Sequence, residues 1–138
     1  MRVQLLGGFR VSVGPRTIEP SEWRLKKAAA LVKLLALAPD HRLHREQAIE
    51  LLWPDSGRST ASNNLRQTLH AARRALAPDP TSGPRYLRSA GESIVLCPEG
   101  VLWVDTEAFE GAVAAARRTR EPAAYRAAVE LYGGDLLP

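Results

Sequence analysis

The chain has 138 residues, 45% of them hydrophobic, which suits one domain of ordinary size with at most a small appendage and excludes a disordered chain. Its net charge of +4 is unevenly distributed: between Arg24 and Arg74 ten Lys or Arg residues face four acidic ones, whereas from Glu99 onward seven acidic residues face four Arg. A basic middle and an acidic C-terminal part predict two surfaces with different partners, the first of them a polyanion.

Cys97 is the single cysteine, which excludes an internal disulfide and a cysteine-rich zinc site and is compatible with a reduced, cytosolic setting. The N-terminal segment MRVQLLGGFRV contains no apolar stretch of signal-peptide length, and no apolar run approaches the roughly 20 residues of a membrane span. We therefore expect a cytoplasmic, nucleoid-associated protein with no membrane partner, no metal and no other cofactor.

Residues 2–18 consist of short apolar runs separated by the turn signals Gly7-Gly8 and Gly14-Pro15. This pattern predicts a small antiparallel sheet. Residues 24–38 have helical spacing with apolar residues around most of the circumference, which predicts a buried central helix ending before Pro39. A short extended link over 41–43 leads to a second helix over 45–53.

The loop DSGRST then offers Ser59 or Thr60 as the N-cap of a third helix over 61–76, whose end Pro78 and Pro80 mark. Residues 85–96 predict a hairpin that turns at Gly91, and 101–104 one more strand. Asp105 is predicted to cap a further helix, and Pro122 to begin a last one that ends before Gly133. These two helices suggest the first repeat of a helical array, or a patch packed on the preceding domain.

The predicted fold class is therefore α+β: a winged helix-turn-helix followed by a short α-helical hairpin. The third helix carries apolar residues on one side and, opposite them, a polar face without a carboxylate that is rich in amides. Polar helix faces are usually only solvated, but Asn, Gln and Arg have the geometry to bind base edges in DNA. The central candidates for base edges or adjacent phosphates are Asn63, Gln67, His70 and Arg74.

Helical spacing does not fix the rotation of this helix, and a second shoulder with Asn64, Thr68 and Ala71 could face the bases instead, Ala71 meeting a thymine methyl group. Arg66 and Arg73 are expected on phosphate, or else are surface charges only. Further phosphate candidates are Arg58, Ser59 and Thr60 at the helix start and Arg24, Lys26 and Lys27 along the first helix. Trp53 is either a core aromatic or an indole donor to phosphate. The wing candidates are Arg85, Arg88, Ser89 and Ser93.

Five segments together resemble SARP-type regulators, the antibiotic regulatory protein family: LLGGFRVSVG, WRLKKAAALVKLLAL, HREQAIELLWPD, NNLRQTLHAARRAL and LYGGDLLP. The resemblance implies an OmpR-type winged-helix DNA-binding domain over residues 1–104 and, over 105–138, the N-terminal part of a bacterial transcriptional activation domain. It also implies binding to repeated promoter sequences and recruitment of RNA polymerase.

The chain departs from this family pattern at two places. His44 stands where the family commonly has Ser or Thr, which predicts a weaker capping box with Gln47. The family's activation domain also continues well beyond the GDLLP-like segment, so the chain is expected either to be a truncated piece or to lack most of that module.

The predicted function is sequence-specific binding of double-stranded DNA, by dimers on adjacent sites, with regulation of transcription. A protein-interaction module without independent activation is the alternative. An enzyme is not predicted, because no nucleophile motif is present and Gly7-Gly8 is too short for a phosphate loop. His41 and His44 could approach a metal ion, but no third ligand is spaced to join them.

Overall fold

The computed structural model describes residues 1–79 and 81–137. Pro80, expected to mark the end of the third helix, and Pro138, the end of the LYGGDLLP segment, lie outside the described residues. The chain forms two compact units: the first joins Met1–Thr17 to Leu102–Pro138, and the second is Ile18–Val101.

The sheet of the first unit has the strand order β3 (Arg16–Thr17), β2 (Arg10–Val13), β1 (Arg2–Gln4) and β7 (Trp103–Val104). The first three strands are antiparallel, as predicted, whereas β7 pairs parallel to β1, with Arg2 opposite Trp103. The predicted boundary at residue 104 assigns the opening sheet to the DNA-binding part, but this pairing places the sheet in one compact unit with the C-terminal helices. A functional boundary at 104 stays a prediction.

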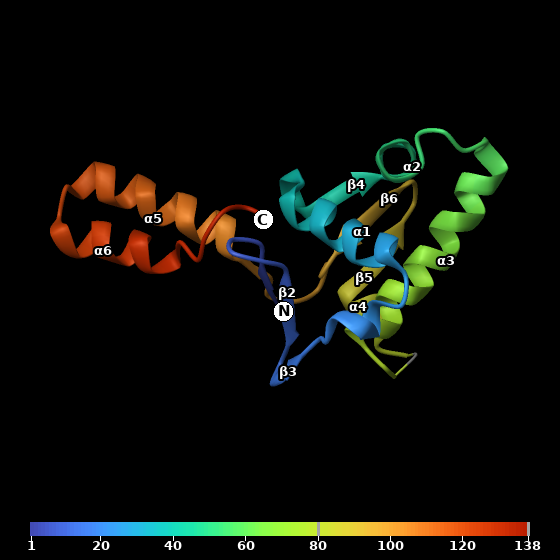
Figure 1. The fold of residues 1–138 in the computed structure, drawn as a ribbon, viewed down its shortest axis with the longest axis horizontal. Coiled ribbons are helices and arrows are strands. Elements are labelled where there is room, and N and C mark those ends of the chain that lie inside the picture. The colour runs from blue at the N-terminus through green and yellow to red at the C-terminus, as the bar shows by residue number, and fades with distance from the viewer. Residues whose placement is uncertain (80, 138) are drawn as a thin grey trace. The chain divides into compact units, whose positions relative to one another are not determined.

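Two antiparallel helices complete the first unit, α5 (Asp105–Thr119) and α6 (Pro122–Leu131) (Figure 1). They bury small residues against each other, including Ala116 and Ala128. The predicted capping role of Asp105 is wrong, because the N-cap is Val104 and no side chain caps the helix. Asp105 is instead the first helical residue, 3% exposed, and its two carboxylate oxygens accept the backbone N–H groups of Leu5 at 2.8 Å and Leu6 at 2.9 Å.

The C-terminal segment of the first unit returns to the N-terminal strand. The N–H of Gly7 donates to the carbonyl oxygen of Asp135 at 2.8 Å, and the N–H of Leu137 donates to that of Leu5 at 2.8 Å. Gly7 has φ +80°, and a Cβ at this position would collide with the carbonyl oxygen of Gly133. The two double-glycine motifs therefore allow the backbones of residues 7 and 133 to lie against each other.

In the second unit, a 3-10 turn η1 (Pro20–Trp23) leads to α1 (Lys26–Leu37), a 3-10 turn η2 (Pro39–His41), β4 (Arg42–His44), α2 (Arg45–Leu52) and α3 (Arg58–Leu76). A one-turn helix α4 (Gly83–Tyr86), which the sequence did not predict, precedes β5 (Leu87–Ala90) and β6 (Ser93–Leu96). The three strands form an antiparallel sheet in the order β4-β6-β5. The largest fully buried side chains of this unit are Leu31, Leu35, Leu65, Leu76, Leu87, Ile94 and Leu96, with Val32 and Thr68.

Two predictions about helix starts are wrong. The N-cap of α3 is Gly57, so Ser59 and Thr60 lie in the first helical turn and do not cap it. The capping box of α2 is complete despite the missing hydroxyl: His44 Nδ1 accepts the N–H of Glu46 at 3.1 Å, and Gln47 Oε1 accepts the N–H of His44 at 3.0 Å. An imidazole nitrogen replaces the Ser or Thr oxygen as the acceptor. Among the described residues, no helix combines the length and apolar character that a membrane crossing requires.

Candidate nucleic-acid interface

The exposed face of α3 consists of the side chains predicted on its polar meridian. Asn63, Gln67, His70 and Arg74 are exposed, and Arg66 is exposed beside them. No Asp or Glu occurs anywhere in α3. The opposite side of the helix is buried, with Leu65 at 0% and Leu69 at 5% exposure. In this fold the predicted meridian faces outward, and its reading of bases stays a prediction.

Two of the three candidates on the second shoulder of α3 are wrong as base-reading residues. Thr68 is 2% exposed and Ala71 is 8% exposed, so neither side chain can reach a base edge in this fold, while Asn64 is partly exposed. The physical reason is that α3 packs against α1, α2, η1, α4 and β5. These elements cover a wider arc of the helix than the apolar stripe alone indicates.

The Arg73 side chain packs within the second unit, whereas that of Arg66 is exposed. Its Nε–H donates to the carbonyl oxygen of Leu87, the first residue of β5, at 2.8 Å. Its side chain packs so closely on α4 that a Cβ added to Gly83 would lie 3.1 Å from Arg73 Cβ. Burial lowers the pKa of the Arg73 guanidinium from its ordinary value. The environments of Arg66 and Arg73 therefore differ, since the Nε–H of Arg73 is engaged by Leu87; the role of either residue on phosphate stays a prediction.

A hollow of about 240 Å³ lies at the C-terminal end of α3. His70, Arg73 and Arg74 supply its polar lining, and none of the described residues that line it is acidic. The remaining wall is Ala77, Gly83 and Pro84. His70 and Arg74 give the hollow a cationic edge, whereas most of its lining is apolar.

The N-terminal end of α3 offers exposed Ser59 and Thr60 together with Arg58. Because Gly57 provides no side-chain cap, the first N–H groups of this helix have no capping side chain and favour an anion. Arg58 forms a 3.3 Å ion pair with Glu46 of α2. Both side chains are largely exposed, at 87% and 58%, so this pair is weak and can be exchanged for a phosphate.

The candidates outside α3 have separate environments. Lys27 Nζ donates to the carbonyl oxygen of Leu52 at 2.7 Å and so ties α1 to the last residue of α2. Arg24 and Lys26 are exposed. Trp53, the C-cap residue of α2, is half-buried, which is compatible both with its packing role and with an exposed ring edge.

The β5-β6 hairpin carries the wing candidates. Its two-residue turn contains Gly91 at φ +61°, as predicted for a tight hairpin, and the carbonyl oxygen of Glu92 accepts the N–H of Arg45 at 2.8 Å. Arg88 forms a 3.0 Å ion pair with Glu99, and this contact holds the pKa of the Glu99 carboxyl below its ordinary value. The other wing candidates are exposed or half-buried: Arg85, Ser89 and Ser93.

The sequence did not reveal the acidic partners of this surface. Glu46 and Glu99 lie 12 and 11 residues from the arginines that they contact. Helical and strand periods relate residues only a few positions apart, so they do not predict these pairs. Within the described part of the chain, no group of three or more His, Cys, Asp and Glu residues is arranged to hold a metal ion.

No family model matches the chain, and no curated protein sequence is similar to it. A similar solved structure is that of EmbR from Mycobacterium tuberculosis in complex with a low-affinity phosphopeptide, with a TM-score of 0.74 and 19% sequence identity. The match covers 99% of this chain and 37% of the EmbR chain, so this chain spans just over a third of that protein. The match and the observed elements confirm the predicted fold class: an α+β winged helix-turn-helix with a C-terminal helical hairpin.

Proposed function

We propose that this protein binds double-stranded DNA in a sequence-specific manner by placing α3 in the major groove. The observation that carries this proposal is the exposed, acid-free face of α3. Asn63 and Gln67, one turn apart at its centre, read base edges, since Asn and Gln bind adenine with two hydrogen bonds. Arg66 contacts phosphate on one flank of the groove.

The two ends of α3 fix the register of the helix on the duplex. At the N-terminal end, Arg58, Ser59 and Thr60 present charge and hydroxyl groups beside the uncapped N–H groups. At the C-terminal end, the exposed His70 and Arg74 supply donors for a backbone phosphate. Phosphate contacts of this kind position a protein on DNA without reading its sequence.

The wider role is regulation of transcription. The winged-helix fold supports it, and so does the resemblance of the five sequence segments to SARP-type regulators. We infer that the chain is a regulator of this type that binds promoter repeats, and that residues 105–138 begin an activation domain that recruits RNA polymerase. Because one α3 reads few base pairs, two copies on adjacent repeats supply the specificity.

Selection of bound fragments from random DNA tests the proposal directly. The expected result is an enriched motif that occurs as two repeats at fixed spacing. Titration with salt on the selected duplex should show a steep loss of affinity, as for about four to eight phosphate contacts per protomer. Absence of an enriched motif together with a flat salt response would contradict DNA binding and favour the alternative, a protein-interaction module.

A further inference from the structure

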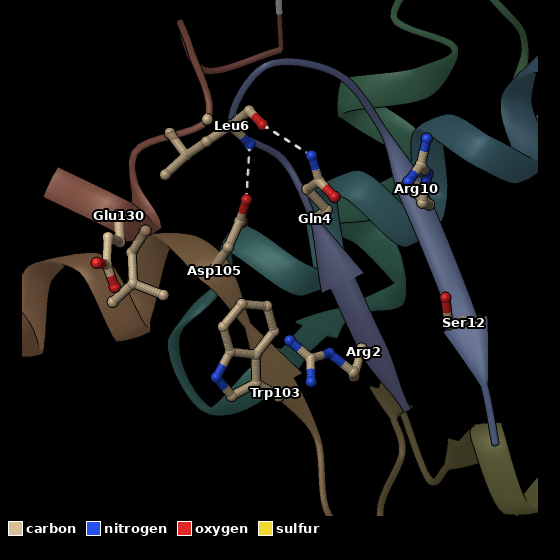
Figure 2. A pocket seen from close by; sticks show the side chains of 10 residues that line it. Arg2, Gln4, Leu6, Arg10, Ser12, Trp103, Asp105 and Glu130 are labelled. Carbon is tan, nitrogen blue, oxygen red and sulfur yellow. Dashed lines mark hydrogen bonds between the residues drawn. The ribbon is translucent and has the colours of Figure 1, made fainter. Parts of the chain in front are cut away.

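A second hollow, of about 300 Å³, lies in the first unit and shares no residue with α3 (Figure 2). Strand register explains its polar side: Arg2 lies opposite Ser12, and Gln4 opposite Arg10, so these four side chains project from one face of the sheet. The alternate residues Val3 and Val11 are buried on the other face. Helix α6 and the loop after it close the hollow with Glu130, Leu131 and Gly133.

Positively and negatively charged side chains line opposite sides of this hollow. Figure 2 shows Glu130 on α6 at one side, and Arg2 and Arg10 on the strands at the other. Asp105 also lines the space, but both of its carboxylate oxygens accept backbone N–H groups, those of Leu5 and Leu6 just after β1. Within the described residues, neither Arg10 nor Glu130 has a side-chain hydrogen bond or an ion pair in the protein.

The guanidinium of Arg2 is held in place by stacking. Its central carbon lies 4.3 Å from the centroid of the Trp103 ring, on the neighbouring strand β7. A stacked guanidinium loses little conformational freedom when it binds a planar carboxylate. Leu6, Leu131 and the Trp103 ring add apolar surface to the same lining.

The geometry points to a binding site for a small zwitterion of the amino-acid class, whose carboxylate lies against Arg2 and Arg10, whose ammonium group lies against Glu130, and whose apolar part contacts Trp103 and the two leucines. A simple anion fits this lining less well, because Glu130 would repel it. A simple amine would face two guanidinium groups. The hollow is within the size range of small-molecule sites.

The site is tested on the full chain with phenylalanine and its two truncated forms. L-Phenylalanine carries both charges, 3-phenylpropanoate only the carboxylate, and 2-phenylethylamine only the ammonium group. Binding is followed in ¹H–¹⁵N spectra by the indole cross-peak of Trp103. The expected result is saturable shifts with L-phenylalanine, and at least tenfold weaker binding of either truncated form.

Two charge-neutralising variants separate the contributions of the two sides. Arg10→Gln should weaken binding of L-phenylalanine at least tenfold and abolish that of 3-phenylpropanoate. Glu130→Gln should weaken L-phenylalanine at least tenfold and strengthen 3-phenylpropanoate. Arg126→Gln, on the same helix but outside the lining, is the matched control and should bind like the parent protein.

Three outcomes would overturn the inference. The first is that the Trp103 cross-peak does not shift at 10 mM of any probe. The second is that 3-phenylpropanoate binds as tightly as L-phenylalanine, and the third is that Arg126→Gln loses as much binding as Glu130→Gln. The second outcome would identify an anion site. DNA binding by α3 is measured separately and does not depend on this result.

Discussion

Gly7 and Gly133, 126 residues apart in the chain, lie backbone against backbone in the first unit. The contact lies beside the residues that follow β1, where the Gly7 N–H donates to the carbonyl oxygen of Asp135 and the Leu137 N–H donates to that of Leu5. It accounts for Gly7, Gly133 and Gly134, because a Cβ on any of them would lie within 3.0 Å of the other chain segment; Gly8 has open space around it and a φ of +143°.

Gly7→Ala should destabilise the protein by about 2–5 kcal/mol, because it adds a methyl group at positive φ and into the Gly133 carbonyl. Urea unfolding monitored by circular dichroism measures the change. Gly111→Ala is the control: this glycine lies within α5 with open space around it, so alanine should stabilise the protein by about 0.5–1 kcal/mol. Equal stability of the two variants would refute the close packing of Gly7.

Asp105→Asn should destabilise the protein by about 1–3 kcal/mol. The amide oxygen can accept one of the two backbone N–H groups from Leu5 and Leu6, while the NH₂ group faces the other donor. The control Glu110→Gln removes an exposed carboxylate from the same helix and should change the free energy of unfolding by no more than about 0.5 kcal/mol. If Asp105→Asn unfolds at the same urea concentration as the control, the carboxylate does not hold α5 to the segment after β1.

Arg73→Gln and Arg74→Gln should have different consequences although the residues are adjacent. Arg73→Gln loses the bond to the Leu87 carbonyl and should cost about 1–3 kcal/mol of stability. Arg74→Gln should leave stability within about 0.5 kcal/mol and weaken DNA binding, because Arg74 is exposed. Thermal unfolding and fluorescence anisotropy on the selected duplex measure the two properties. The assignment fails if Arg74→Gln is the less stable protein.

Gln67→Ala and Arg66→Ala should separate base reading from phosphate binding. Gln67→Ala is expected to relax base preference at one position of the motif, with a loss of about 1–3 kcal/mol on the preferred sequence. Arg66→Ala should weaken all sequences alike and reduce the slope of log affinity against log salt by about one unit. Binding to the selected duplex and to single-base variants distinguishes these effects, and the reverse pattern would exchange the two roles.

Glu99→Gln should increase DNA affinity several-fold at low salt, because it frees Arg88 of the wing from its acidic partner. Arg88 holds the pKa of Glu99 below its ordinary value, so the pair persists as pH falls and breaks only when the pH passes this lowered pKa. The gain should therefore vanish at a pH below it. Glu110→Gln makes the same change in net charge on α5, and an equal gain there would show a general charge effect.

Local sequence patterns alone determined most of the helices and strands, because helical and strand periods and Gly or Pro punctuation act over a few residues. The apolar stripe and the amide-rich face of α3 likewise placed Asn63 and Gln67 on its exposed side. The four-residue helix α4 was not predicted, because it is too short to show a helical repeat of apolar residues.

Only the tertiary structure decided which candidate residues of α3 remain accessible. Thr68 and Ala71 lie on a shoulder that neighbouring elements cover, and Arg73 is drawn to the Leu87 carbonyl, 14 residues away. The pairing of β7 with β1 and the contact of Gly7 with Gly133 also depend on residues about 100 or more positions apart. Packing between distant segments decides burial, ion pairing and the hollows between elements. Local sequence periods span only a few residues, so they cannot predict such contacts.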